Sequence, residues 1–146
     1  MKYSKIIKDF LEKKKYSQIN LKAALFDMDG VLYDSMKNHA VAWCNSTKAF
    51  GVNFNKEDAY LHEGRTRIST INWAYQRQYD RDATEEEIEN IYELKESEYN
   101  KFPDASPMIG TSKVLEKIKE NDLTAIVVTG SSQESLLDRL ENDFPN

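Results

Sequence analysis

The spacing of hydrophobic residues predicts two short strands among helices. Nearly continuous apolar runs at residues 21–26 and 123–128 each stop at polar residues and glycine, Asp27-Met28-Asp29-Gly30 in the first case and Thr129-Gly130-Ser131-Ser132 in the second. Compact apolar runs that end in this way are typical of strands buried in a parallel sheet, whose carboxyl ends open into loops. We therefore predict two buried core strands.

Helical spacing flanks the second strand on both sides. A segment that opens at Thr111 and closes at Asn121 carries apolar residues on one face, and Ser131 or Ser132 is placed to cap another helix after the strand. Helix–strand–helix is the repeating unit of an open α/β sheet.

The N-terminal residues 4–15 also have helical spacing, with apolar positions set among lysines (Ile6, Ile7, Phe10 and Leu11). We expect an ordinary helix docked on the core with its lysines in solvent. A basic helix lying on a membrane surface is the alternative. Asp9 and Glu12 interrupt its positive charge, which makes that alternative weaker.

The roughly 80 residues between the two strands are predicted to be all-helical. One helix ends near Gly51, another covers Ile68–Tyr75, and Thr84 with Glu87 forms a capping box that begins a third. Prolines 103 and 107 then indicate an extended return, since proline resists helix. The predicted fold is α/β: a Rossmann-like parallel-sheet core with two main strands, interrupted by a helical cap. The expected divisions are residues 1–35, the cap at 36–106, and the rest of the core at 107–146.

Composition narrows the classes of function. The chain has 146 residues, 40% of them hydrophobic, and a net charge of −5 without a basic tract, so we expect no nucleic-acid partner. Its single cysteine cannot form an internal disulfide. No apolar run approaches the ~18–20 residues of a membrane helix, and the N-terminus lacks the apolar stretch of a signal peptide. We therefore expect a cytoplasmic protein with no membrane association.

The polar residues that follow the strands carry the candidate chemistry. Ligands of open parallel sheets bind beyond the carboxyl ends of the strands. Asp27 and Asp29 could hold Mg²⁺, which prefers oxygen ligands, and one carboxylate could act as a nucleophile while the other moves a proton. Gly30 allows a sharp turn that brings backbone N–H groups near an oxyanion, and Thr129 and Gly130 offer a hydroxyl and a backbone donor to phosphate.

Two segments resemble a known family. Residues 27–35, Asp-Met-Asp-Gly-Val-Leu-Tyr-Asp-Ser, resemble the first signature of the haloacid dehalogenase superfamily of phosphohydrolases and phosphotransferases, and residues 127–131 resemble the second. The helical insert is similar to the cap of the subgroup that contains β-phosphoglucomutase and phosphoglycolate phosphatase. The resemblance covers residues 21–141.

The resemblance implies a role for each matching position. Asp27 matches the nucleophile that forms an aspartyl-phosphate and binds Mg²⁺. Asp29 matches the general acid/base, with its backbone carbonyl on the metal. Thr129 matches the hydroxyl that binds the transferred phosphoryl group, and Gly130 follows it with a backbone donor.

Three positions in the helical insert also match residues of the family's cap, and each of them has an alternative interpretation. His39 matches a cap-helix histidine of the sugar-phosphate mutases, or it is a partly exposed helix histidine. Arg67 fits the cation that meets the distal phosphate of the substrate, with Arg65 as the competitor. Lys95 aligns with a cap lysine near that phosphate, or it is a solvated helix lysine.

The resemblance leaves part of the family pattern unmatched. No lysine follows Lys119, and no acidic pair follows a later strand. We therefore expect the sequence to be the N-terminal portion of a longer enzyme, weakly active or inactive alone. The leading prediction is a Mg²⁺-dependent phosphatase of a small phosphorylated metabolite, such as a sugar phosphate. A β-phosphoglucomutase-like phosphotransferase is the close alternative, and an inactive relative or binding module is the third.

Overall fold

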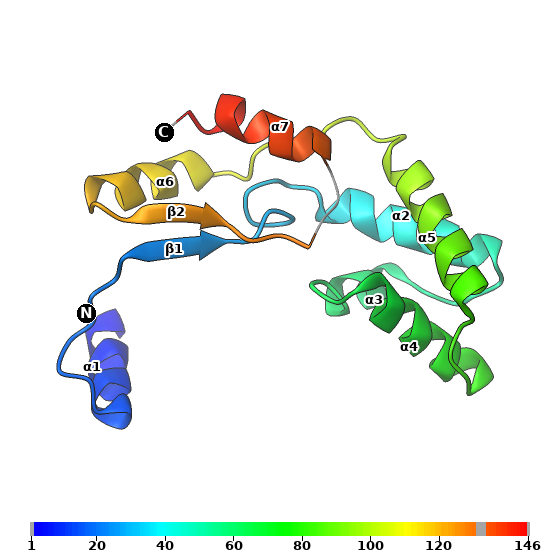
Figure 1. Cartoon of the computed structure of the whole chain (residues 1–146), viewed down its shortest axis with the longest axis horizontal. Coiled ribbons are helices and arrows are strands. Elements are labelled where there is room, and N and C mark those ends of the chain that lie inside the picture. Colours follow the sequence, from blue (N-terminus) through cyan, green and yellow to red (C-terminus); the bar gives the residue numbers. More distant parts are fainter. Residues whose placement is uncertain (1, 131–133, 146) are drawn as a thin grey trace.

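The computed structural model describes residues 2–130 and 134–145. Two groups of elements are visible in Figure 1: a two-stranded sheet with helices on one side, and a separate helical block. The helices are α1 (Lys2–Lys14), α2 (Met36–Ala49), α3 (Lys56–Leu61), α4 (Arg67–Tyr79), α5 (Glu85–Tyr99), α6 (Thr111–Glu120) and α7 (Glu134–Asp143), and the strands are β1 (Ala23–Phe26) and β2 (Thr124–Val127).

The sheet is parallel, as predicted. β1 pairs with β2 in a register that places Ala23 opposite Thr124 and Phe26 opposite Val127. Both arrows point toward the helical block, and α6 and α7 lie on the same side of the sheet (Figure 1). Because two parallel strands require a long connection, the α/β fold accommodates the whole block of α2–α5 between them.

Local signals fixed most helix boundaries. The Thr84–Glu87 capping box is present, with each side chain bonded to the other residue's backbone N–H. The helix predicted to end near Gly51 does end at Ala49, and Gly51 has a φ of +73°. The short helix α3 was not predicted, although Asn55 and Asp58 form a second capping box at its start. The predicted caps Ser131 and Ser132 lie outside the described residues.

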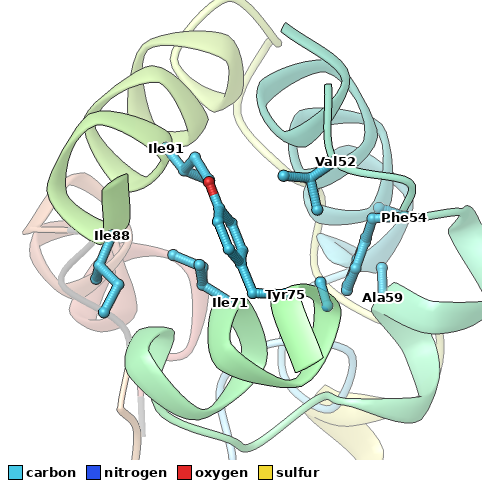
Figure 2. Packing of buried hydrophobic residues seen from close by; sticks show 9 residues of the cluster. Val52, Phe54, Ala59, Ile71, Tyr75, Ile88 and Ile91 are labelled. Carbon is cyan, nitrogen blue, oxygen red and sulfur yellow. The ribbon is translucent and has the colours of Figure 1, made fainter. Parts of the chain in front are cut away.

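Two apolar clusters hold the described structure together. The larger lies within the helical block, where Tyr75 of α4 lies among apolar side chains that include Ile91 of α5 and Ile71 (Figure 2). The smaller surrounds the loop after β1: Met28, Leu32 and Tyr33 are buried there with Ala105. The second cluster therefore anchors the backbone that carries the candidate carboxylates.

Two expectations about burial were wrong. The strands are not buried: Leu25 of β1 is 67% exposed, and its partner Ile126 of β2 is 41% exposed. The helices α6 and α7 cover one side of the sheet, so the side chains on its other side remain in solvent (Figure 1). Helix α1 is not docked either, since its residues Ile6 and Phe10 remain exposed. Of the described helices, none has the length and apolar character needed to cross a bilayer.

Candidate active site

The loop after β1 is closed by hydrogen bonds between backbone groups. The amides of Leu32 and Tyr33 both donate to the carbonyl of Met28, and the amide of Gly30 donates to the carbonyl of Tyr33 at 2.8 Å. Gly30 adopts a φ of +74°, which favours glycine. The turn was predicted, but the N–H of Gly30 itself is used within the loop and is not free for an oxyanion.

The parallel register brings the two polar strand ends together. The amide of Val128 donates to the carbonyl of Phe26 at 2.8 Å, so the pairing continues past the strand ends. Asp27 therefore follows β1 at the same edge of the sheet at which Thr129 follows β2. This edge faces the helical block.

A cavity of about 820 Å³ lies at this edge. All eight residues singled out from the sequence line it: Asp27, Asp29, His39, Arg65, Arg67, Lys95, Thr129 and Gly130. They come from both strand ends, from α2, from the α3–α4 connection with the start of α4, and from α5. The structure thus brings together residues up to about a hundred positions apart, whose chemical roles stay predictions.

The carboxylate of Asp29 is held in a fixed position. The hydroxyl of Ser35 donates to its Oδ1 at 2.6 Å, and Nε2 of His39 lies 3.1 Å from the same oxygen. The His39 ring also stacks on Tyr99, with centroids 4.3 Å apart. His39 is only 7% exposed, so it is not the partly exposed helix histidine that the sequence left open.

Lys95 is buried at the cavity wall. Its side chain is 8% exposed, and its Nζ lies 5.4–5.8 Å from the ring centroids of Trp43, Tyr92 and Tyr99. Within the described part of the chain, no carboxylate pairs with this ammonium. Burial lowers the pKa of Lys95, while the charges of Glu96, Asp29 and Glu63 raise it. The alternative of a solvated helix lysine is therefore wrong.

The two candidate arginines differ in their surroundings. Arg67 forms an ion pair with Glu89 at 3.3 Å and lies over the ring of Tyr92, 4.9 Å from its centroid. Lys95 lies near the same ring, so Arg67 and Lys95 are neighbours in the cavity wall. The guanidinium of Arg65 has no ion pair among the residues that the structure describes. Both arginines line the cavity, and Arg67 differs from Arg65 by its ion pair with Glu89.

The sequence did not single out several other lining residues. Trp43, Tyr92 and Tyr99 line the cavity, and their rings surround Lys95. Glu63 lines it as well, and burial together with Asp29 and Asp27 raises the pKa of its carboxyl group, against the lowering effect of His39. His62 lines it too. Their position two and three residues before Arg65 was the signal in the sequence that could have pointed to them.

Few of the described side chains at the cavity could bind a metal ion. Asp27 and Asp29 both line the cavity, and one Asp27 oxygen accepts the Met28 amide at 2.8 Å. In the described ranges, no group of three histidine, cysteine or acidic side chains could hold a metal. Mg²⁺ commonly binds through one or two carboxylates and completes its shell with waters and substrate phosphate. Two carboxylates at an open cavity fit that pattern.

The architecture and site agree with comparisons to known proteins. Residues 21–144 match the family model of haloacid dehalogenase-like hydrolases. The chain belongs to this family of hydrolases. The resemblance seen in the sequence is therefore confirmed at the level of the family.

Particular proteins extend this comparison. The chain is similar to the solved structure "Putative beta-phosphoglucomutase from Bacteroides vulgatus", with 53% identity, a TM-score of 0.89, and coverage of 96% of this chain and 56% of that one. A β-phosphoglucomutase from Clostridium difficile shares the fold at 21% identity and a TM-score of 0.61, over 84% of this chain and 56% of that one. An uncharacterised protein of Haemophilus influenzae is 29% identical over 117 residues, which are 80% of this chain and 56% of that protein. The chain thus spans little more than half the length of these relatives.

Proposed function

We propose that the protein is a Mg²⁺-dependent phosphohydrolase of small phosphorylated metabolites that acts through an aspartyl-phosphate. The observation that carries this proposal is a cavity whose lining includes Asp27, Asp29 and Thr129 together with the buried Lys95. Carboxylates for chemistry and cations for a substrate anion are thereby placed around the same space.

The proposed reaction forms an aspartyl-phosphate and then hydrolyses it. An oxygen of Asp27 attacks the phosphorus of a phosphate monoester, and the bond from phosphorus to the ester oxygen breaks. Asp29, in its protonated form, donates its proton to the leaving alkoxide, and the products are an alcohol and the Asp27 acyl phosphate. Water then attacks that phosphorus and gives a proton to Asp29, which releases inorganic phosphate and restores Asp27. Ser35 and His39 hold the Asp29 carboxylate in place for both transfers.

Mg²⁺ would be held by the Asp27 carboxylate and by Asp29, and it would neutralise negative charge on the phosphoryl oxygens. Thr129 and Gly130 would donate hydrogen bonds to those oxygens. Phosphoryl transfer depends mostly on positioning and on such charge stabilisation.

The helical block at residues 36–106 would act as a cap that recognises the rest of the substrate. Lys95, in its aromatic surroundings, together with Arg67 or Arg65, would bind a second anionic group of the substrate. Arg67 is the first choice because it shares the ring of Tyr92 with Lys95. This arrangement suits a sugar phosphate better than a nucleic acid or a membrane surface.

A β-phosphoglucomutase-like phosphotransferase is the second candidate. His39, Arg67 and Lys95 all line the cavity, and the relative at 53% identity is described as a β-phosphoglucomutase. In that reaction a second hydroxyl of the sugar, instead of water, would accept the phosphoryl group from Asp27. The two candidates share the first chemical step and differ only in the acceptor.

The decisive experiment incubates the 146-residue chain with Mg²⁺ and β-glucose 1-phosphate, beside an Asp27→Asn variant. Intact-mass spectrometry after rapid acid quenching should show one added phosphoryl group on the wild-type chain and none on the variant. Release of inorganic phosphate supports the hydrolase. Formation of an isomeric sugar phosphate, without release of inorganic phosphate, supports the phosphotransferase. Equal labelling of both chains would show that Asp27 is not the nucleophile, and no labelling or turnover would favour an inactive relative or binding module.

A further inference from the structure

His62 is a buried residue of the cavity wall that the proposed chemistry does not use. It follows α3 as its C-cap residue and is 4% exposed. Nδ1 of its ring lies 2.8 Å from the backbone carbonyl of Asp58. A carbonyl oxygen can only accept a hydrogen bond, so Nδ1 carries the proton. In the neutral ring, Nε2 is then an acceptor with a free lone pair.

The Nε2 edge of the ring is the edge left for the cavity. The opposite edge is turned onto the last turn of α3, and no described residue forms a hydrogen bond with Nε2. In the described part of the chain, the fully buried side-chain polar atoms without a hydrogen bond are the Tyr33 hydroxyl and Asp143 Oδ2. Nε2 of His62 is not one of them, and His62 lines the cavity.

Neighbouring side chains hold this ring in one orientation. The Trp73 ring packs on it with centroids 4.0 Å apart, and Phe54 lies on it at 6.3 Å. Arg77 covers the Trp73 ring at 4.2 Å and also binds both carboxylate oxygens of Asp58 at 3.0 Å. The carbonyl that fixes His62 thus belongs to a residue that is itself fixed. Because the ring is held in place, Nε2 can accept a hydrogen bond only from a donor at one position.

The chemistry of the acceptor restricts its partner. Phosphate oxygens also accept hydrogen bonds, so they do not match a neutral imidazole nitrogen. The adjacent Glu63 carboxylate adds a second acceptor to the same wall and repels an anion. A hydroxyl group donates to such acceptors without carrying charge.

We propose that His62 is a specificity-determining residue, whose Nε2 accepts a hydrogen bond from a hydroxyl group of the substrate. This inference rests on the proposed function, because it assumes that a phosphorylated substrate occupies the cavity. It assigns the substrate class as a polyhydroxylated phosphate ester, with the phosphate near Asp27 and a hydroxyl at His62.

The test compares two probes by isothermal titration calorimetry on the 146-residue chain with Mg²⁺: glucose 6-phosphate, and ethyl phosphate, which lacks hydroxyl groups. The variant His62→Asn keeps a donor for the Asp58 carbonyl and, because its side chain is shorter, leaves no acceptor at the position of Nε2. It should weaken glucose 6-phosphate binding by about three- to tenfold, as expected for one hydrogen bond, without a matching loss for ethyl phosphate. Tyr60→Phe, an exposed position on α3, is the matched control and should bind both probes as the wild type does.

A loss of equal size for both probes, or no loss for either, would overturn the role of His62 while leaving the proposed function intact. Failure of the wild-type chain to bind either probe would instead overturn the proposed function, and this inference with it. If His62→Asn lowers the melting temperature strongly, His62→Phe repeats the test, because its ring keeps the packing on Trp73 and lacks both nitrogens.

Discussion

Nε2 of His39 lies 3.1 Å from Oδ1 of Asp29, and both residues are more than nine-tenths buried. His39 belongs to the second turn of α2, whereas Asp29 belongs to the loop after β1. Ser35, which precedes α2, donates to the same carboxylate oxygen. The start of α2 is therefore hydrogen-bonded to the side chain of Asp29, in the same loop as the candidate nucleophile Asp27, so the helical block and the sheet meet at the site.

His39→Ala should destabilise the protein. The substitution leaves the buried Asp29 carboxylate with fewer partners and removes the ring that stacks on Tyr99. We expect a loss of about 1–3 kcal/mol in the free energy of unfolding, seen as a fall of several degrees in melting temperature. Lys37→Ala, on the exposed face of the same helix, is the control and should change stability by less than about 0.5 kcal/mol. Equal effects of the two variants would contradict a structural role for the contact.

Lys95→Met should stabilise the chain at neutral pH. Burial lowers the pKa of the Lys95 ammonium, so the folded state disfavours the charged form relative to the unfolded state. The free energy of unfolding of the wild type should therefore rise with pH as the solution passes from the lowered folded pKa toward the ordinary lysine value. Urea unfolding at several pH values should show that this rise is absent in Lys95→Met. Lys48→Met, at an exposed position of α2, should keep it.

Gly30→Ala should be more harmful than an alanine at another glycine with positive φ. A Cβ at Gly30 would lie 2.7 Å from Cγ of Met36, and the φ of +74° would also be strained. At Gly110, where φ is +95°, a Cβ would meet nothing within 4 Å. We expect thermal unfolding to show a cost of about 1 kcal/mol for Gly110→Ala and about 2–4 kcal/mol for Gly30→Ala. The reverse order would show that Met36 moves aside without cost.

Tyr33→Phe should flatten the loss of stability at alkaline pH. Burial raises the pKa of the Tyr33 phenol to about 12, whereas the unfolded phenol titrates near 10. Between these values the folded state holds the proton more tightly, so the free energy of unfolding falls as pH rises, by about 2–3 kcal/mol for a shift of two units. The variant should lose that part of the fall, measured by denaturant unfolding from pH 9 to 12. Tyr60→Phe should reproduce the wild-type curve, and an unchanged curve for Tyr33→Phe would refute the assignment.

Elements governed by local chemistry were predictable. The Thr84–Glu87 capping box depends on residues three positions apart, and Gly51 supplies the positive φ that follows α2. The helix α3 was missed because its six residues are too few to show a helical pattern of apolar positions, although the Asn55–Asp58 capping box marked its start. In the site, the Asp27–Asp29 spacing and Thr129 stood out because each follows an apolar run.

Burial was the part that the sequence could not supply. Lys95 lies in a helix rich in charge and was equally consistent with a solvated position, yet three aromatic rings enclose it. Leu25 lies in an apolar run of the kind that is usually buried, yet its side chain is exposed in the structure. Exposure depends on which other elements cover a residue, and that is a property of distant parts of the chain.

The sequence by itself determined the family, the parallel order of two strands and the pair of acidic residues at a strand end, because periodicity, caps and short motifs act over a few residues. Only the tertiary structure decided that eight residues from five parts of the chain share one cavity, that Lys95 is buried and that the His62 ring packs against the Trp73 ring at the wall of the cavity. These contacts join residues far apart in the chain, and their energies depend on desolvation and packing that form only when the elements assemble.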